Sequence, residues 1–174
     1  MEEKLITIGI TSYNAQNTIG DAIESILNQT YDNIELLILN DKSNDNTVKI
    51  AKSYRKYFSS LCVIDYPRSG RAKCHNYAES IANTDILLFT DSETQFAKDF
   101  ISNIVKPFID PKVGISVGKL IFRDPYKSTT AKSFKVFWNF VAKIFERKNH
   151  VFRKSFIVFD ELLIKINFFR IEKF

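Results

Sequence analysis

Two carboxylates, Asp91 and Glu93, stand one residue apart directly after the apolar run Ile86–Phe89. A short run of bulky residues bounded by polar ones is typical of a buried strand, so both carboxylates are predicted at the rim of a sheet. Placed there, they would repel each other unless a cation lay between them. A hard divalent cation that brings a phosphate is the natural partner. The spacing favours a metal–diphosphate site, with a polar loop or helix N-terminus as the alternative.

Polar clusters also follow two other strand patterns. The β-branched stretch Leu5–Ile10 runs into Thr11–Asn14, and the apolar stretch Ile34–Leu39 runs into Asn40–Asp45. Ligands of open α/β sheets bind at the carboxyl ends of the strands. We therefore expect all three clusters to converge at one edge of the sheet.

Strand and helix patterns alternate four times over about the first ninety residues. The alternation predicts an α/β fold, with a mostly parallel, Rossmann-like sheet flanked by helices. The apolar spacing from Ile19 to Leu27 predicts a helix, opened by a capping box at Thr18 and Asp21. The other expected helices cover 48–58, 70–81, 96–108 and 134–145, and the other expected strands cover 61–64, 113–117 and 156–159.

The three clusters together suit a nucleotide diphosphate. Tyr13 could stack on a base, and Asp41 could accept a hydrogen bond from a base N–H. The cations Arg68, Arg71 and Lys73, with the metal, could neutralise the diphosphate.

Several other phosphate and metal motifs are excluded. The sequence has no G-x-G-x-x-G after the first strand and no G-x-x-x-x-G-K-[ST]. Residues 41–45 begin like a calcium loop, but Asn46 replaces the expected glycine and Lys52 the expected acid. A phosphatase-type aspartate pair is excluded because Gln95 stands where a hydroxyl is needed.

Charge and aromatic residues are unevenly distributed along the 174 residues, whose net charge is +5. Residues 132–174 hold ten Lys or Arg and four acids, and are rich in Phe. We predict a core over 1–126 that contains the nucleotide-diphosphate site, and a basic, Phe-rich C-terminal segment over 127–174. Such a segment suits an anionic membrane surface or a solvated basic face over an aromatic core, and a nucleic-acid partner is not expected.

The sequence contains no stretch of 18 apolar residues and no signal-peptide pattern. We expect a cytoplasmic protein, in peripheral contact with the inner face of the membrane. Cys62 and Cys74 fit no metal or redox spacing and are expected as reduced thiols. The isolated His75 and His150 make a zinc site improbable.

Ordered motifs within residues 4–118 resemble those of family 2 inverting glycosyltransferases, which have the GT-A fold. The matching stretches are 8–14, 25–31, 35–47, 70–76 and 87–93. The resemblance implies that Thr11, Tyr13 and Asp41 hold the base of a nucleotide sugar, commonly uridine. Asn14 and Lys73 complete the implied nucleotide site. Asp91 would lie near the ribose and the metal, and Glu93 would bind Mn²⁺ or Mg²⁺.

The chain departs from the family pattern at three of these positions. Glu93 replaces the usual aspartate, His75 replaces a frequent arginine, and Asn40 replaces the first residue of the usual acidic pair. Asp41, the second residue of that pair, is retained.

The general base of the acceptor half is the most serious departure. An inverting transferase needs a base to deprotonate the acceptor hydroxyl. Residues 159–161 and 168–171 resemble the flanks of the family's base motif, but 162–167 contain no acid. Asp160 or Glu161 is therefore the candidate base, in an acceptor half that is short for the family.

Three functions remain open. The first is transfer of a sugar from a nucleotide-diphosphate donor, with UDP as the expected nucleotide, to a sugar, lipid-linked or protein acceptor with inversion. The second is a degenerate module that binds the nucleotide sugar without catalysing transfer. The third is a membrane-surface interaction through the basic C-terminal segment.

Overall fold

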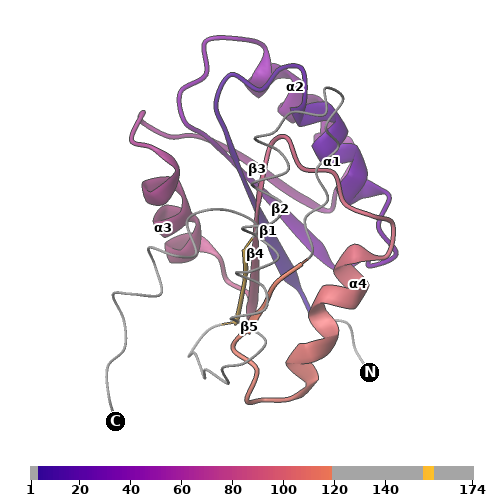
Figure 1. The fold of residues 1–174 in the computed structure, drawn as a ribbon. Helices are drawn as coiled ribbons and strands as arrows, with labels where there is room; N and C mark the ends of the chain where they lie inside the picture. Colours follow the sequence, from indigo (N-terminus) through magenta and orange to yellow (C-terminus); the bar gives the residue numbers. More distant parts are fainter. Residues whose placement is uncertain (1–3, 119–154, 159–174) are drawn as a thin grey trace, which may run out of the picture.

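The structure is a computed structural model, which describes residues 4–118 and, as a strand, 155–158 (Figure 1). The expected helix over 134–145, the boundary at 126–127, Asp160 and Glu161 lie outside the described residues.

Within the described residues, six strands form one sheet in the order β3-β2-β1-β4-β6-β5. Every pair of neighbours is parallel, so the predicted mostly parallel sheet is confirmed. The strands are β1 (Ile6–Ser12), β2 (Ile34–Asn40), β3 (Ser60–Asp65), β4 (Ile86–Asp91), β5 (Ile115–Ser116) and β6 (Ser155–Val158). The strand expected at 156–159 is β6, and the one expected at 113–117 is reduced to β5.

Helices cover both faces of the sheet, as the alternation predicts. They are α1 (Ile19–Leu27), α2 (Thr47–Ser53), α3 (Arg71–Ile81) and α4 (Phe100–Val105), with 3₁₀ turns η1 (Tyr54–Tyr57) and η2 (Lys106–Ile109). Figure 1 shows α3 on one side of the sheet and α1, α2 and α4 on the other. No described helix has both the length and the apolar character that crossing a bilayer requires.

The two faces of the strands build two hydrophobic clusters. Ile8, Ile10 and Leu88 pack with α1, α2 and α4, whereas Leu39 and Phe89 pack with α3. Because both faces of β1, β2 and β4 are covered, these strands are continuous apolar runs rather than alternating patterns. Burial on both faces fixes their register, and with it the place where each strand ends.

Two details of the helix predictions are wrong. The capping box at Thr18 does not form, because the Thr18 hydroxyl donates to the carbonyl of Ala15 at 3.4 Å. The helix expected from residue 96 begins at Phe100, because Ser25 of α1 and Gln29, just after α1, hold the preceding segment by hydrogen bonds. The Ser25 hydroxyl accepts from Phe96 N, and the Gln29 amide donates to Ala97 O and accepts from Ile101 N.

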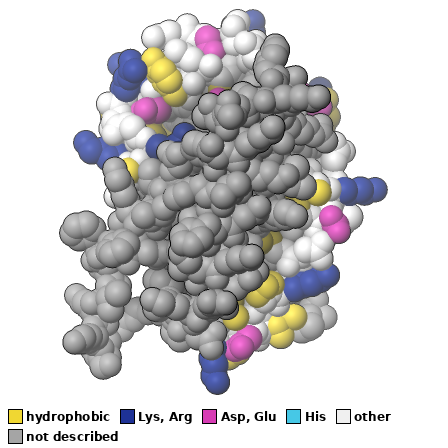
Figure 2. All heavy atoms as spheres, in the orientation of Figure 1, with side chains coloured by type: hydrophobic (Ala, Val, Ile, Leu, Met, Phe, Trp, Pro, Cys, Tyr) yellow, Lys and Arg dark blue, Asp and Glu magenta, His cyan; other side chains and the backbone are white. Residues whose placement is uncertain are grey.

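Charged side chains of both signs are interspersed on the described surface visible in Figure 2. Lys and Arg do not gather there into a single patch. The basic segment expected from the sequence lies almost entirely outside the described residues.

Candidate functional site

The three polar clusters meet at the carboxyl edge of the central strands, as predicted. Thr11 lies opposite both Leu39 and Asp91, and Ser12 lies opposite Asn40. Parallel pairing in register therefore brings three segments distant in sequence to the same rim of the sheet.

A cavity of about 250 Å³ opens at this rim. Its lining combines residues from the ends of β1, β2 and β4 with two residues of α3: Thr11, Ser12, Tyr13, Asp41, Arg71, Cys74, Asp91, Ser92 and Glu93. Five predicted site residues are among them, namely Thr11, Tyr13, Asp41, Asp91 and Glu93. The cavity thus gathers carboxylates, hydroxyls, an aromatic ring and a guanidinium group.

Asp91 is a half-buried carboxylate of the cavity, with 27% of its side chain exposed. Thr11 Oγ1 donates to its Oδ1 at 3.5 Å, and Arg71 Nε lies 3.6 Å from the same atom. Burial raises the pKa of Asp91, Glu93 raises it further, and Arg71 and Thr11 oppose the rise. Burial therefore disfavours the charged form of Asp91, and Arg71 and Thr11 offset only part of that effect.

Asp41 holds the loop that enters α3. Its Oδ1 accepts from Ser69 N at 2.8 Å, its Oδ2 accepts from Gly70 N at 3.2 Å, and its own N–H donates to Ser12 O at 2.8 Å. Gly70 has φ 84°, a left-handed conformation that suits glycine. Because each carboxylate oxygen has two lone pairs, Asp41 keeps acceptor capacity toward the cavity.

Tyr13 presents a ring at the mouth of the cavity, where 40% of the residue is exposed. The guanidinium carbon of Arg68 lies 4.6 Å from its centroid. Arg68 comes from the β3–α3 loop, so this cation–π contact joins the loops that follow β1 and β3.

Two predicted nucleotide-binding residues, Asn14 and Lys73, do not line the cavity. Asn14, with φ 48°, donates its N–H to Ser43 Oγ and accepts from Asn44 N through its side chain. It therefore ties the β1–α1 loop to the β2–α2 loop. Lys73 lies exposed on α3.

Two lining residues, Cys74 and Ser92, were not individually predicted as site residues, whereas Arg71 was predicted as one of three cations near the diphosphate. Arg71 and Cys74 stand three residues apart, so they share a helix face that Lys73 does not. That spacing was available in the sequence as a signal. Burial, followed by the charge of Asp41, raises the pKa of the Cys74 thiol to about 11, so the thiol stays protonated.

His75, where the family often has arginine, packs away from solvent at 5% exposure. Its ring stacks on Phe89 with centroids 4.2 Å apart. Burial, with a smaller effect of Arg71, lowers the pKa of His75 to about 4. His75 is therefore a neutral, buried imidazole stacked on a residue of β4, and it does not line the cavity.

The residues fit a divalent cation in part. No group of three or more His, Cys, Asp or Glu side chains gathers as a metal site among the described residues. Asp91 and Glu93 nevertheless line one cavity, and their mutual repulsion is the kind that a cation relieves. Protein sites for Mg²⁺ often supply one or two carboxylates and leave the other positions to substrate phosphates and water.

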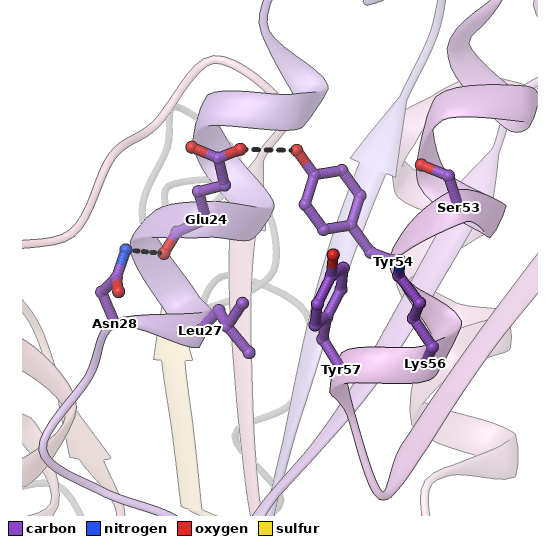
Figure 3. A pocket seen from close by; sticks show the side chains of 7 residues that line it. All are labelled: Glu24, Leu27, Asn28, Ser53, Tyr54, Lys56 and Tyr57. Atoms are coloured by element: carbon purple, nitrogen blue, oxygen red, sulfur yellow. Dashed lines mark hydrogen bonds between the residues drawn. The ribbon is translucent and has the colours of Figure 1, made fainter.

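A second cavity, of about 430 Å³, lies between α1 and α2–η1 (Figure 3). It is lined by Glu24, Leu27, Asn28, Ser53, Tyr54, Lys56 and Tyr57. The Tyr54 hydroxyl donates to Glu24 Oε1 at 2.8 Å, and this bond is the main cause that raises the pKa of Tyr54 to about 12. No strand end contributes to this cavity, so we place the functional site in the smaller one.

Known glycosyltransferases are similar to this chain in sequence. "Glycosyltransferase GlyA" of Streptococcus pneumoniae is 26% identical over 113 residues, which cover 65% of this chain and 16% of that protein. "UDP-Glc:alpha-D-GlcNAc-diphosphoundecaprenol beta-1,3-glucosyltransferase WfaP" of Escherichia coli is 36% identical over 100 residues, which cover 58% of this chain and 39% of that protein. The chain therefore spans well under half of these relatives.

A solved structure shares the fold. The mannosyltransferase PcManGT of Pyrobaculum calidifontis, in complex with GDP-Man and Mn²⁺, matches with a TM-score of 0.63 and 26% identity over 69% of this chain and 37% of that one. The expected GT-A-type fold is thus confirmed. The model of the family described as "Glycosyl transferase family 2" matches residues 7–170, and the chain belongs to that family.

Proposed function

We propose that the protein transfers a sugar from a nucleotide-diphosphate donor, with UDP as the nucleotide, to an acceptor hydroxyl with inversion. One observation carries the proposal: Tyr13, Asp41, Asp91 and Glu93 come from three strand ends and line one cavity together with Arg71. The cavity combines an aromatic ring that can stack on a base, a carboxylate that can accept a hydrogen bond from a base, and a pair of carboxylates that can bind a cation. A nucleotide diphosphate matches each of these groups.

Each side chain has a role in the proposed donor site. Tyr13 stacks on the base, Thr11 lies beside it, and Asp41 accepts a base N–H. Asp91 lies near the ribose and, with Glu93, would hold Mn²⁺ or Mg²⁺. Such an ion, when bound, supplies positive charge to the departing diphosphate. Asn14 acts by holding the loop behind Tyr13, and Lys73 supplies charge from outside the cavity.

The relatives support this donor class. The name of the E. coli relative gives UDP-Glc as its donor, a diphosphoundecaprenol-linked sugar as its acceptor and a β-1,3 linkage as its product. Because the glucose of UDP-glucose is α-linked, a β-linked product corresponds to inversion. The P. calidifontis structure holds GDP-Man and Mn²⁺. A lipid-linked sugar is accordingly our first acceptor candidate, ahead of a free sugar or a protein.

The chemical step requires a base. We assign it to Asp160 or Glu161, whose carboxylate would take the proton of the acceptor hydroxyl. The acceptor oxygen then bonds to the anomeric carbon as the bond from that carbon to the diphosphate oxygen breaks. The nucleoside diphosphate leaves with the bonding electrons.

A second candidate function is nucleotide-sugar binding without transfer. The absence of any acid from residues 162–167 favours it, because that is where the family's base motif is expected. Donor binding is common to both candidates, and only transfer separates them.

Calorimetric titration of UDP, with and without Mn²⁺, tests the donor site. We expect metal-dependent binding that Asp91→Ala abolishes. Asp85→Ala is the matched control, because Asp85 is exposed just before β4, at the opposite end of the same strand. Binding that ignores the metal, or equal loss in both variants, would contradict the site.

Transfer is tested separately with Asp160→Asn and Glu161→Gln. Loss of transfer with retained UDP binding in one variant identifies the base. If both variants transfer sugar as fast as the wild type, the base assignment is wrong.

We also propose a cytoplasmic location, with peripheral contact to the inner face of the membrane through the basic segment 127–174. Co-sedimentation with anionic vesicles tests this contact. Binding should occur at low salt and weaken at high salt, because surface charges are screened. Salt-independent or absent binding counts against it.

A further inference from the structure

Asn40, the last residue of β2, is a buried junction with 1% exposure. Its Nδ2 donates to Asp65 Oδ1 at 2.5 Å, and its Oδ1 accepts from the Ser43 hydroxyl at 2.5 Å. Its backbone carbonyl accepts from Tyr66 N at 2.8 Å. One residue therefore joins the end of β2 to the end of β3 and to the β2–α2 loop.

These hydrogen bonds connect Asn40 to residues on both sides of the proposed base site. Ser43 Oγ accepts the N–H of Asn14, which directly follows Tyr13. On the other side, the chain beyond Tyr66 carries Arg68, which lies over the Tyr13 ring, and Ser69, whose N–H binds the Asp41 carboxylate. Asn40 itself does not line the cavity, and neither does Asp65.

The residue types at 40 and 65 are complementary. An amide has both a donor and an acceptor, so Asn40 can serve Asp65 and Ser43 at once. A carboxylate at position 40 could not donate, and it would place two like charges at hydrogen-bond distance. Removing the acceptor at 65 would instead leave a buried N–H without its partner.

We infer that Asn40, paired with Asp65, is the positioning residue that holds Tyr13 and Asp41 in place for the nucleotide base. This inference rests on the proposed function. The pair acts at a distance, because it fixes the loops after β2 and β3, whose groups hold the segment of Tyr13 and the carboxylate of Asp41.

The test is titration of UDP, in the presence of Mn²⁺, into variants in which the residue types at positions 40 and 65 are changed or exchanged. Asn40→Asp should weaken UDP binding about tenfold, because a charge-pair repulsion replaces a hydrogen bond. Adding Asp65→Asn should restore affinity to within about threefold, because the amide then lies on the other partner. Asn44→Asp is the matched control: it adds the same charge to the same loop at an exposed side chain and should bind as the wild type does.

The pH dependence of UDP binding separates repulsion between the two carboxylates from general damage to the fold. Lowering the pH from about 8 to about 5 should shrink the deficit of Asn40→Asp relative to Asn44→Asp, because one proton shared by the two carboxylates restores a donor. The swapped double variant should show no such recovery.

Amide hydrogen exchange decides the inference without any nucleotide. Exchange at Ser69 and Gly70, whose N–H groups bind Asp41, should be faster in Asn40→Asp and normal in the double variant. Should Asn40→Asp fail to fold, Asp65→Leu removes the same bond at an exposed position, and Asp65→Asn keeps an acceptor there. If the wild-type protein does not bind UDP, the donor site is refuted. Hydrogen exchange would still show whether Asn40 and Asp65 hold the loop in place. Unchanged exchange and unchanged affinity in Asn40→Asp would overturn the inference.

Discussion

Arg71 Nε lies 3.6 Å from Asp91 Oδ1, where helix α3 meets the end of β4. The guanidinium group thus provides positive charge at the carboxylate proposed to bind the metal. With 42% of the Arg71 side chain exposed, the pair is also open to solvent. Donor binding would let the same guanidinium turn toward the diphosphate.

Replacing Arg71 should therefore affect metal and nucleotide in opposite directions. In Arg71→Met, Mn²⁺ affinity without nucleotide should rise by less than about fivefold, because a partly exposed ion pair is worth at most about 1 kcal/mol. UDP affinity should fall about tenfold or more, because a charged hydrogen bond to phosphate contributes about 1.5–3 kcal/mol. Calorimetry measures both. Arg55→Met, at an exposed position on η1, is the control, and equal effects in the two variants would refute the role of Arg71.

Glu93 is exposed at the rim, so its replacement should leave the fold intact while changing the metal site. In Glu93→Gln, Mn²⁺ should no longer strengthen UDP binding, because the amide lacks the charge that holds a hard cation. Glu93→Asp, which restores the family's usual residue, should retain the metal effect. Titrations with and without Mn²⁺ compare the three proteins. A Gln variant with a full metal effect would remove Glu93 from the ligand set.

His75 should make the protein less stable in mild acid. Because burial lowers its pKa from 6.5 to about 4, the unfolded chain takes up a proton before the folded one does. Stability is thus unaffected above pH 6.5 and declines as the pH falls from there toward 4, by at most about 3 kcal/mol. Urea unfolding across this range should show a shallower decline for His75→Leu. Parallel curves for the two proteins would exclude the histidine as the cause.

Gly9 lies in β1 opposite Phe89 of β4, and a Cβ built there would come within 3.0 Å of the Phe89 ring. Gly9→Ala should lower the free energy of unfolding by about 1–3 kcal/mol through overpacking. In a Phe89→Leu background the same change should cost less, and urea unfolding of the four proteins measures the coupling. Gly20→Ala is the control, because the nearest atom to its Cβ would be the Tyr54 hydroxyl at 3.4 Å. Equal losses at both glycines would refute the steric explanation.

The sheet and the edge that holds the candidate site were predictable because strands buried on both faces appear in the sequence as continuous apolar runs. The apolar runs before Thr11, Asn40 and Asp91 can be covered on both faces only inside an α/β layer. Once the strands are parallel, their polar ends must share one rim. Five of the predicted site residues accordingly line the cavity.

What could not be predicted depends on contacts between distant segments. Asn14 turns away from the cavity because Ser43 and Asn44 bind it. The start of α4 is set by Ser25 of α1 and by Gln29, which lies just after α1. Sequence periodicity describes one element at a time, so it does not report bonds of this kind.

The place of β6 has a consequence for how the chain is made. This short strand lies between β4 and β5 and pairs with both, although it follows them late in the sequence (Figure 1). Before Ser155 is synthesised, the edge of β4 that β6 covers has no partner in the described sheet, and β5 has no described strand to join. Because unpaired strand edges promote aggregation of incomplete chains, the four residues of β6, the last of the described sheet to be synthesised, also cover an edge that is prone to aggregate.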